Sequence, residues 1–116
     1  MNYSTPGNPT IYLLGGLTGS GKTELLYHLS ALGEQVLDLE ALCCHDGSAF
    51  AAIRYSQQPT SYRFHKQLHK LWQAFDKNRP LFIEQELPRI GNLNLPDWLY
   101  QQMIQAPVIW LQTEKH

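Results

Sequence analysis

The sequence has little excess charge, few cysteines and no long apolar run. Its 116 residues carry a formal net charge of −1, so no long-range positive field would gather a polyanion such as RNA. The two cysteines, Cys43 and Cys44, are neighbours; a disulfide between adjacent residues is strained and rare, which predicts reduced thiols. No apolar run approaches the roughly 20 residues that span a bilayer, and the N-terminus does not resemble a secretory signal. These absences predict a soluble, cytoplasmic protein with no membrane partner.

What is present is an alternation of short apolar runs and amphipathic segments. Each apolar run is rich in β-branched or aromatic residues and predicts a buried strand, at residues 11–14, 35–39, 81–84 and 107–111. Helices are predicted at residues 22–32, at residues 61–77, and from Pro96 onward. The first helix would place four leucines on one face: Leu25, Leu26, Leu29 and Leu32. Strands alternating with helices favour right-handed βαβ units, so the sequence predicts a three-layer α/β fold.

The chain reads as a single domain. Residues 1–10 are expected to form a disordered lead-in, and residues 11–116 the domain. The least periodic part, residues 41–61, is expected to be a long functional insertion between a strand and a helix.

The segment "GLTGSGKT", residues 16–23, fits G-x-x-x-x-G-K-[ST] at every fixed position and lies between a predicted strand and helix, as a phosphate-binding P-loop requires. Its glycines let successive N–H groups converge on an anion, and the helix N-terminus adds its positive dipole end. Lys22 would reach the outer phosphates, and Thr23 would place its hydroxyl on Mg²⁺. The predicted phosphate-binding residues are Gly16, Gly19, Ser20, Gly21, Lys22 and Thr23. A P-loop NTPase-like fold would order the short parallel sheet of about four strands as 2-3-1-4, flanked by helices.

Acidic residues follow two of the predicted strands. Glu84 and Glu86 end "LFIEQE", where a Walker B carboxylate would hold Mg²⁺ or polarise its water, and Glu84 is the favoured metal ligand. A solvated loop is the alternative for this pair. Asp38 and Glu40 end the second strand, where the tip of an open α/β sheet faces the ligand crevice. We expect one of these two carboxylates to point at the acceptor substrate.

Three further blocks, taken together with the P-loop, resemble the P-loop domain of tRNA 2-selenouridine synthase, which exchanges sulfur for selenium in a wobble thiouridine of certain tRNAs. They are "QVLDLEAL" followed by "HDGSAF", then "QQPTSYRFHKQL", then "IEQELPRIG", and the similarity covers residues 11–111. The resemblance implies geranyl diphosphate and selenophosphate as co-substrates. It also implies a rhodanese-like domain that handles the chalcogen, and nothing in this sequence corresponds to that domain.

The resemblance also implies roles for individual residues. Lys22, Glu84 and Arg89 would be catalytic. The residues implied to bind substrate are Asp38, Glu40, His45, Gly47, Ser48, Glu86 and Gly91. At three positions the sequence departs from the family pattern: Ala41 replaces a glycine, Asp46 an arginine and Leu87 a serine. The reversed charge at Asp46 should weaken phosphate or tRNA contacts there.

The sequence therefore predicts a P-loop domain that binds ATP, GTP or a prenyl diphosphate with Mg²⁺, and contributes to sulfur-to-selenium exchange with tRNA through a rhodanese-like partner. The alternatives are a small-molecule kinase or NTPase-like P-loop protein, and a degenerate, non-catalytic phosphate-binding module. Because the chain stops soon after residue 111, we expect a domain truncated at its C-terminal end that does not complete selenium transfer alone. Residues 107–111 would form an apolar edge strand, which predicts a homodimer or a covering partner.

Smaller signals favour ordinary packing over chemistry. The run from Cys43 to His45 lacks metal-ligand spacing, so its thiols are expected to pack rather than to bind metal or act as nucleophiles. His65 and His69 lie four residues apart but without the glutamate of H-E-x-x-H, which favours a solvated helix face over a metal site.

The remaining candidates are aromatic and basic. Trp72 and Trp98 lie in apolar stripes and predict core positions, whereas Tyr62 and Trp110 would stack on bases only if they are exposed. The candidates for a second anion contact are Arg54, Arg63, Arg79 and Arg89, with Arg89 favoured.

Overall fold

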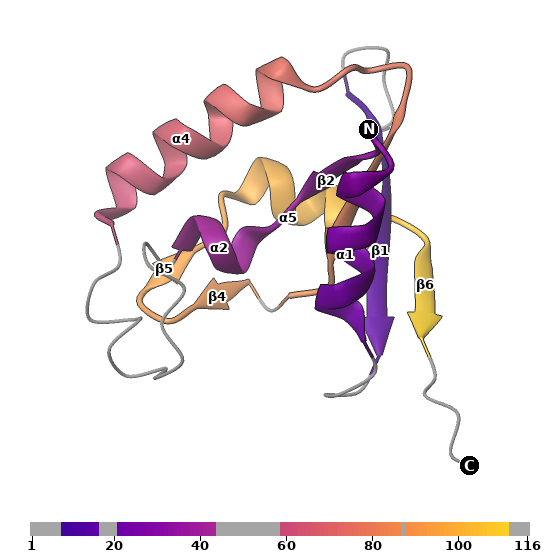
Figure 1. The fold of residues 1–116 in the computed structure, drawn as a ribbon. Helices are drawn as coiled ribbons and strands as arrows, with labels where there is room; N and C mark the ends of the chain where they lie inside the picture. The colour runs from indigo at the N-terminus through magenta and orange to yellow at the C-terminus, as the bar shows by residue number, and fades with distance from the viewer. Residues whose placement is uncertain (1–7, 17–20, 44–58, 87, 112–116) are drawn as a thin grey trace.

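A computed structural model of the chain describes residues 8–16, 21–43, 59–86 and 88–111 (Figure 1). Along the chain the elements are β1 (Thr10–Gly16), α1 (Lys22–Ala31), β2 (Gln35–Leu37), α2 (Leu39–Cys43), α4 (Ser61–Ala74), β3 (Pro80–Glu84), β4 (Arg89–Ile90), β5 (Leu93–Asn94), α5 (Asp97–Ile104) and β6 (Val108–Leu111). The main sheet has four strands in the order β2-β3-β1-β6, and every neighbouring pair is parallel. Since β6 is the fourth of the strands expected from the sequence, the α/β class and the order 2-3-1-4 are confirmed.

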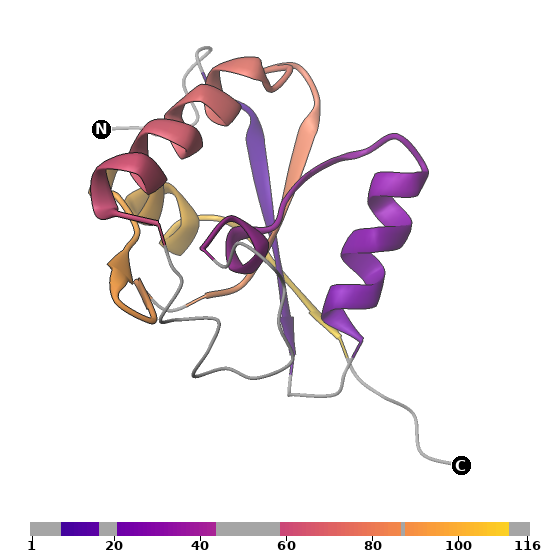
Figure 2. The same cartoon turned by 60° about the vertical axis from the view of Figure 1, so that its left-hand side comes forward.

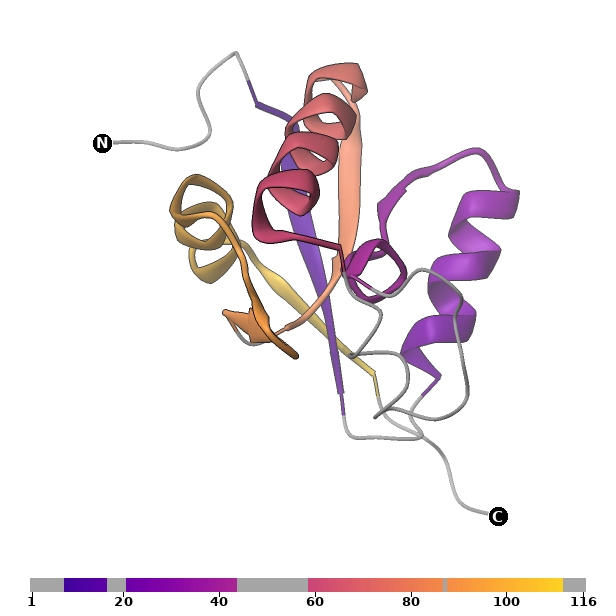
Figure 3. The ribbon, with the colours of Figure 1, turned by 90° about the vertical axis from the view of Figure 1, so that its left-hand side faces the viewer.

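The sheet is covered unequally on its two faces. Helices α4 and α5 lie on one face and α1 on the other, with strand β1 between them (Figures 2 and 3). On the α4 and α5 face, Ile11 and Leu13 of β1 join one large core cluster with side chains from β3, both helices and the β4–β5 hairpin. On the α1 face, Leu14 and Leu26 are buried. The core therefore sits mainly between the sheet and helices α4 and α5.

Helix α1 does not bury all four of its leucines. Leu26 is buried and Leu29 is half-buried, but Leu32 is 79% exposed. Leu32 is the C-cap, directly after the last helical residue, and Gly33 with φ of 89° turns the chain towards β2. The prediction that Leu32 shares the buried face is wrong.

Helix α4 buries only part of the apolar face that its spacing predicts, because Leu71 of that face is 41% exposed, and the helix is shorter than expected. The Thr60 hydroxyl accepts a hydrogen bond from the Arg63 amide at 3.2 Å and caps the first turn. Phe64, Leu68 and Trp72 are buried against the sheet. The helix stops at Ala74 rather than at residue 77, because Phe75 takes an extended backbone conformation.

The β4–β5 hairpin was not expected from the sequence. Arg89 pairs with Asn94 and Ile90 with Leu93, leaving a two-residue turn. Gly91 occupies the first turn position with φ of 61°, as a type II′ turn requires. Strands of two residues are too short to show a period-2 pattern, although their apolar residues Ile90 and Leu93 are buried in the core.

Strand β6 is an edge strand, as expected, but it is not buried. Val108, Ile109 and Trp110 are 44%, 41% and 55% exposed. The prediction of a buried strand at residues 107–111 is therefore wrong: β6 is the last strand of the sheet and pairs only with β1 among the described strands. The homodimer or covering partner expected for this edge stays a prediction, which sedimentation velocity of the chain would test.

Two predicted boundaries move. Strand β2 ends at Leu37, two residues early, because the short helix α2 begins at Leu39 and the Asp38 side chain accepts a hydrogen bond from the Ala41 amide of that helix. Helix α2 takes the first residues of the expected insertion, and residues 44–58 lie outside the described ranges. Asn8, assigned to the lead-in, accepts a hydrogen bond from the Trp72 indole at 3.3 Å, so the folded part begins earlier than expected. None of the described helices is long and apolar enough to cross a membrane.

Candidate functional site

The site is built around the junction of β1 and α1, where the P-loop motif lies. Gly16 ends β1 with φ of 151°, and Gly21, with φ of 91°, is the N-cap of α1. A glycine cap has no side chain to satisfy the first N–H groups of the helix, which leaves them to a ligand. Gly19 and Ser20 lie outside the described residues. So do three of the residues that the family resemblance implies to bind substrate, His45, Gly47 and Ser48.

Lys22, the first residue of α1, bonds back to the end of β1. Its Nζ donates a hydrogen bond of 2.9 Å to the carbonyl oxygen of Gly16, six residues earlier. The ammonium group is thus held near the end of β1 by a neutral acceptor. A phosphate oxygen is a stronger acceptor for an ammonium group than a neutral carbonyl, because charge-assisted hydrogen bonds are about twice as strong.

Four carboxylates gather after the ends of β2 and β3, and two of them, Glu84 and Glu86, lie close enough to Lys22 to feel its charge. Burial raises the pKa of Glu84; Lys22 opposes that shift, and the nearby carboxylates of Asp38 and Glu40 add to it. Burial also raises the pKa of Glu86 to about 7, with further repulsion from Glu40 and Glu84. The structure therefore brings the acids expected after two separate strands into one electrostatic cluster. A solvated loop would not bury them.

Asp38 has a structural task in addition. Its Oδ1 accepts a hydrogen bond from the Ala41 amide at 3.0 Å, and its carbonyl accepts one from the Leu42 amide at 3.1 Å. These contacts begin helix α2 and explain an aspartate at this position without a ligand. Contact of Asp38 or Glu40 with a substrate stays a prediction.

The oxygen donors at this end of the sheet suit Mg²⁺ bound together with a phosphate. Among the described residues, no group of three histidine, cysteine or acidic side chains is arranged to hold a metal ion. Magnesium is usually held by one or two carboxylates plus substrate phosphates and water rather than by a cage of protein ligands. Thr23, next to Lys22 in the chain, and Glu84, which lies close enough to feel the Lys22 charge, are oxygen donors of the required kind, so the donor chemistry fits a metal that arrives with its phosphate ligand.

Arg89 and Gly91 lie on the β4–β5 hairpin, and both have local roles. The Arg89 Nε donates a hydrogen bond of 2.9 Å to the Gly91 carbonyl, within the same hairpin. The Arg89 side chain is exposed, and its predicted catalytic role stays a prediction. Among the other arginine candidates, Arg54 lies outside the described residues. Arg79 is bonded to the Gly33 carbonyl at the opposite end of the sheet from the P-loop, and an anion contact by Arg79 stays a prediction.

An apolar pocket, which the sequence did not predict, opens beside the carboxylates. Its volume is about 460 Å³, and its lining residues are Leu13, Gln85, Glu86, Tyr100, Met103, Ile104, Ala106 and Val108. A Cβ on Gly15 would come within 2.7 Å of Gln85 Oε1, 3.0 Å of Val108 Cγ1 and 3.1 Å of a Trp110 ring carbon. Gly15 directly precedes the P-loop motif in the sequence. Because it has no side chain, Gln85, Val108 and Trp110 can lie close to the β1 backbone at this position.

The smaller signals have mixed outcomes. Cys43 is fully buried in the core cluster, as expected, and Cys44 lies outside the described residues. The histidines are not simply solvated, since His65 bonds the Asn94 carbonyl at 2.8 Å and His69 meets the Trp98 ring edge-on at 6.3 Å. The core position of Trp72 is confirmed, whereas Trp98 is partly buried and packs against it at 5.2 Å between ring centroids.

Comparison with known proteins agrees with this geometry. The family model described as tRNA 2-selenouridine synthase AAA domain matches residues 9–116. A tRNA 2-selenouridine synthase of Cupriavidus pinatubonensis is 40% identical over 102 residues, covering 86% of this chain and 26% of the relative. The Pseudomonas putida (strain GB-1) enzyme of the same name is 40% identical over 107 residues, covering 86% and 26%. That of Nitrosomonas eutropha is 37% identical over 110 residues, covering 90% and 27%. The chain thus spans about a quarter of the length of these curated relatives.

Proposed function

The chain belongs to the tRNA 2-selenouridine synthase AAA-domain family, and from this premise we propose that it is the P-loop part of a tRNA-modifying transferase that binds geranyl diphosphate with Mg²⁺. In this proposal the domain contributes to sulfur-to-selenium exchange at a wobble thiouridine, together with a rhodanese-like partner. The observation that carries the proposal is the position of Glu86, which belongs both to the carboxylate cluster around Lys22 and to the lining of the apolar pocket.

The phosphate end of the ligand is assigned to the P-loop. The uncapped first turn of α1 offers N–H donors, and the Lys22 ammonium exchanges the Gly16 carbonyl for a phosphate oxygen. Thr23 and Glu84 would hold Mg²⁺, which supplies charge neutralisation for a departing diphosphate. The N–H groups of the first turn of α1 are held in place by the helix before a ligand arrives, so they would stabilise leaving-group charge without reorganisation.

The hydrocarbon end is assigned to the pocket. Its volume of about 460 Å³ lies in the range of small-molecule sites, and most of its lining is aliphatic or aromatic. Nucleotide bases and riboses carry many polar groups that such a lining leaves unpaired, which costs binding free energy. An isoprenoid chain has no polar groups, so it does not incur this cost when it enters the pocket. This contrast favours a prenyl diphosphate over ATP or GTP.

The test is calorimetric titration with geranyl diphosphate, pyrophosphate, ATP and GTP, each with Mg²⁺. Lys22→Ala should lose both diphosphates, whereas Lys77→Ala, which removes an exposed lysine beyond the end of α4, should lose neither. Ile104→Asp, on the pocket wall, should weaken geranyl diphosphate and leave pyrophosphate unchanged. Leu32→Asp is the matched control, since Leu32 is an exposed aliphatic residue that does not line the pocket.

The alternatives make different predictions in the same experiment. Preference for ATP or GTP, with no effect of Ile104→Asp, would favour a kinase or NTPase-like protein. Absence of binding by all four ligands would favour a degenerate module.

A further inference from the structure

The solvent face of helix α4 carries basic side chains and no acidic ones. Arg63, Lys66 and Lys70 are exposed on the face opposite to the buried Phe64, Leu68 and Trp72. No aspartate or glutamate occurs anywhere in residues 61–74. We call Arg63, Lys66 and Lys70 the α4 basic stripe. At 1.5 Å of rise per residue, its three cations are spaced about 4.5 Å and 6 Å along the helix axis.

Nothing in the described part of the chain neutralises the stripe. Its three side chains form no ion pair with a described residue. The ion pair that the described residues do form joins Arg79 to Glu34, outside the stripe. Like charges at i and i+4, as at Lys66 and Lys70, destabilise an isolated helix by a few tenths of a kcal/mol. Fold stability therefore gives no reason for this arrangement, whereas an anionic partner does.

An exposed aromatic ring lies within the same face. Tyr62 is 75% exposed, and the Lys66 ammonium lies 5.8 Å from the centre of its ring. A lysine beside an exposed aromatic ring is the pairing that nucleic-acid-binding surfaces use, since the cation meets the backbone while the ring stacks on a base.

Four of the described acids lie together elsewhere. Asp38, Glu40, Glu84 and Glu86 gather at the carboxyl end of the sheet and would repel a polyanion. The net charge of −1 thus conceals a separation of charge between that end and the outside of α4. The first half of α4 is fixed to the hairpin through His65 and the Asn94 carbonyl, and β4 of the hairpin follows Glu86 closely in the chain (Figure 1). The stripe therefore begins near the site and runs away from it.

We propose that the α4 basic stripe and Tyr62 bind the phosphate backbone and one base of an RNA strand. The assignment rests on the proposed function in expecting an RNA substrate, and adds the surface that holds it. An RNA bound along α4 would lie outside the acidic end of the sheet, with only its reacting nucleotide entering the site.

The test measures binding of a fluorescein-labelled RNA stem–loop by anisotropy over a range of salt concentrations. The double variant Lys66→Glu/Lys70→Glu should bind at least about tenfold more weakly at low salt, and its salt slope should fall by about two contacts. Lys77→Glu is the control for each of the two substitutions, because it makes the charge change of one of them on an exposed lysine outside the stripe. Tyr62→Ala should lose about tenfold, and Tyr62→Phe should retain binding, because stacking needs the ring and not the hydroxyl.

Geranyl diphosphate titration separates this proposal from the previous one. The stripe variants should bind geranyl diphosphate as the native chain does, and Lys22→Ala should bind RNA unchanged. Equal RNA affinity of the double variant and Lys77→Glu overturns the stripe. So does loss of binding to phosphatidylserine vesicles in the double variant with RNA binding intact, which would assign the face to a membrane surface.

Discussion

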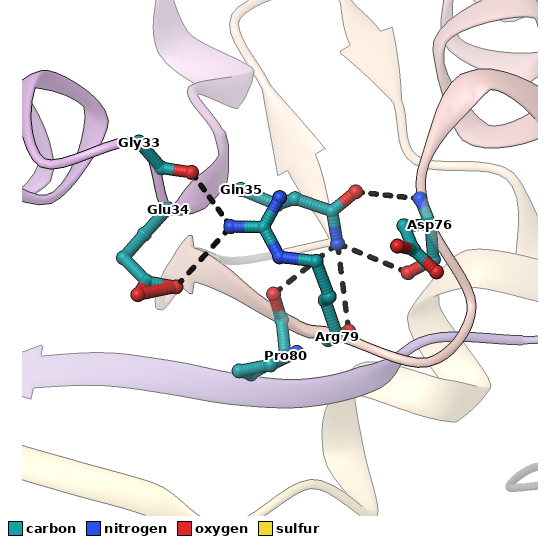
Figure 4. A network of polar contacts seen from close by, with 6 residues as sticks. All are labelled: Gly33, Glu34, Gln35, Asp76, Arg79 and Pro80. Atoms are coloured by element: carbon teal, nitrogen blue, oxygen red, sulfur yellow. Dashed lines mark hydrogen bonds and ion pairs between the residues drawn. The ribbon is translucent and has the colours of Figure 1, made fainter.

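The two ends of the sheet treat their polar side chains in opposite ways. At the amino end, where β2 and β3 begin, the Gln35 side-chain amide bonds the segment between α4 and β3 (Figure 4). Its nitrogen donates to the Asp76, Arg79 and Pro80 carbonyls, and its oxygen accepts from the Asp76 N–H. Arg79 in that segment donates to the Gly33 carbonyl at 2.6 Å and faces Glu34. At the carboxyl end, four carboxylates crowd beside one lysine, and burial and repulsion raise the pKa values of Glu84 and Glu86.

The difference separates structure from function within one sheet. Polar groups at the amino end pair with one another across the two loops, and this pairing fixes the start of β3 against β2. Ionisable groups at the carboxyl end gather at a cost to the fold, which is the usual sign of a site. Substitutions at the amino end should therefore change stability alone, and substitutions at the carboxyl end should change ligand binding first.

The largest effect should come from Lys22→Ala. Loss of a charge-assisted contact to the ligand should weaken diphosphate binding by about 100-fold, or roughly 2.7 kcal/mol. The free energy of unfolding should change by less than about 1 kcal/mol, because the lost bond to Gly16 is partly exposed. Calorimetry and urea unfolding of the same preparation measure both quantities. An unfolding change larger than the binding change would break the contrast between the ends.

Gln35→Ala is the counterpart at the amino end. It removes an amide that accepts from the Asp76 amide at 2.5 Å and donates to the Asp76, Arg79 and Pro80 carbonyls. We expect a loss of about 2 kcal/mol in the free energy of unfolding, and no change in diphosphate affinity. Gln73→Ala, on the exposed face of α4, controls for removal of a glutamine. Weakened diphosphate binding by Gln35→Ala would contradict the separation.

Glu86→Gln should reveal the cost of the crowded carboxylates as a pH dependence. With its pKa raised to about 7 in the fold, Glu86 binds a proton more tightly in the folded chain than in the unfolded one. Its stabilising contribution is therefore present below about pH 4.5 and is lost as pH rises through 7. The variant should be more stable than the native chain at pH 8 by about 1 kcal/mol, after allowance for solvent screening, and equal to it at low pH.

Urea unfolding at several pH values measures this difference. Glu24→Gln, an exposed carboxylate in the first turn of α1, serves as the control for the same change of group. Parallel pH profiles of Glu86→Gln and the native chain would show that Glu86 is an ordinary surface carboxylate.

How far the sequence predicts these features depends on how local their signals are. The strands, the P-loop and the acids after Ile83 are each encoded by a short contiguous stretch of sequence, so their positions in the fold could be predicted from their order along the chain. The pocket is assembled from β1, α5, β6 and the segment after β3, and no single stretch of sequence carries it. At Leu32 a local signal is misleading instead. The residue has the spacing of the buried leucines, but the helix ends at Ala31 and Leu32 is exposed. Asp38 and Arg89 could each have a structural or a functional role, and the sequence alone does not separate the two. Their structural roles became visible only through their hydrogen bonds to the Ala41 amide and the Gly91 carbonyl.

The smallest expected effect belongs to Glu34. Its carboxylate lies 3.6 Å from Arg79 Nη2, and the two side chains are 38% and 44% exposed. An exposed ion pair of this kind contributes a few tenths of a kcal/mol, so Glu34→Gln should cost about 0.3 kcal/mol at low salt and nothing at about 1 M salt. Arg79→Ala should cost more, about 1 kcal/mol, because it also removes the hydrogen bond to the Gly33 carbonyl, which salt does not screen in the same way. Urea unfolding at both salt concentrations tests the pair. A loss in Glu34→Gln that approaches that of Gln35→Ala and persists in salt would mean that charge, rather than the Gln35 amide, holds the amino end together.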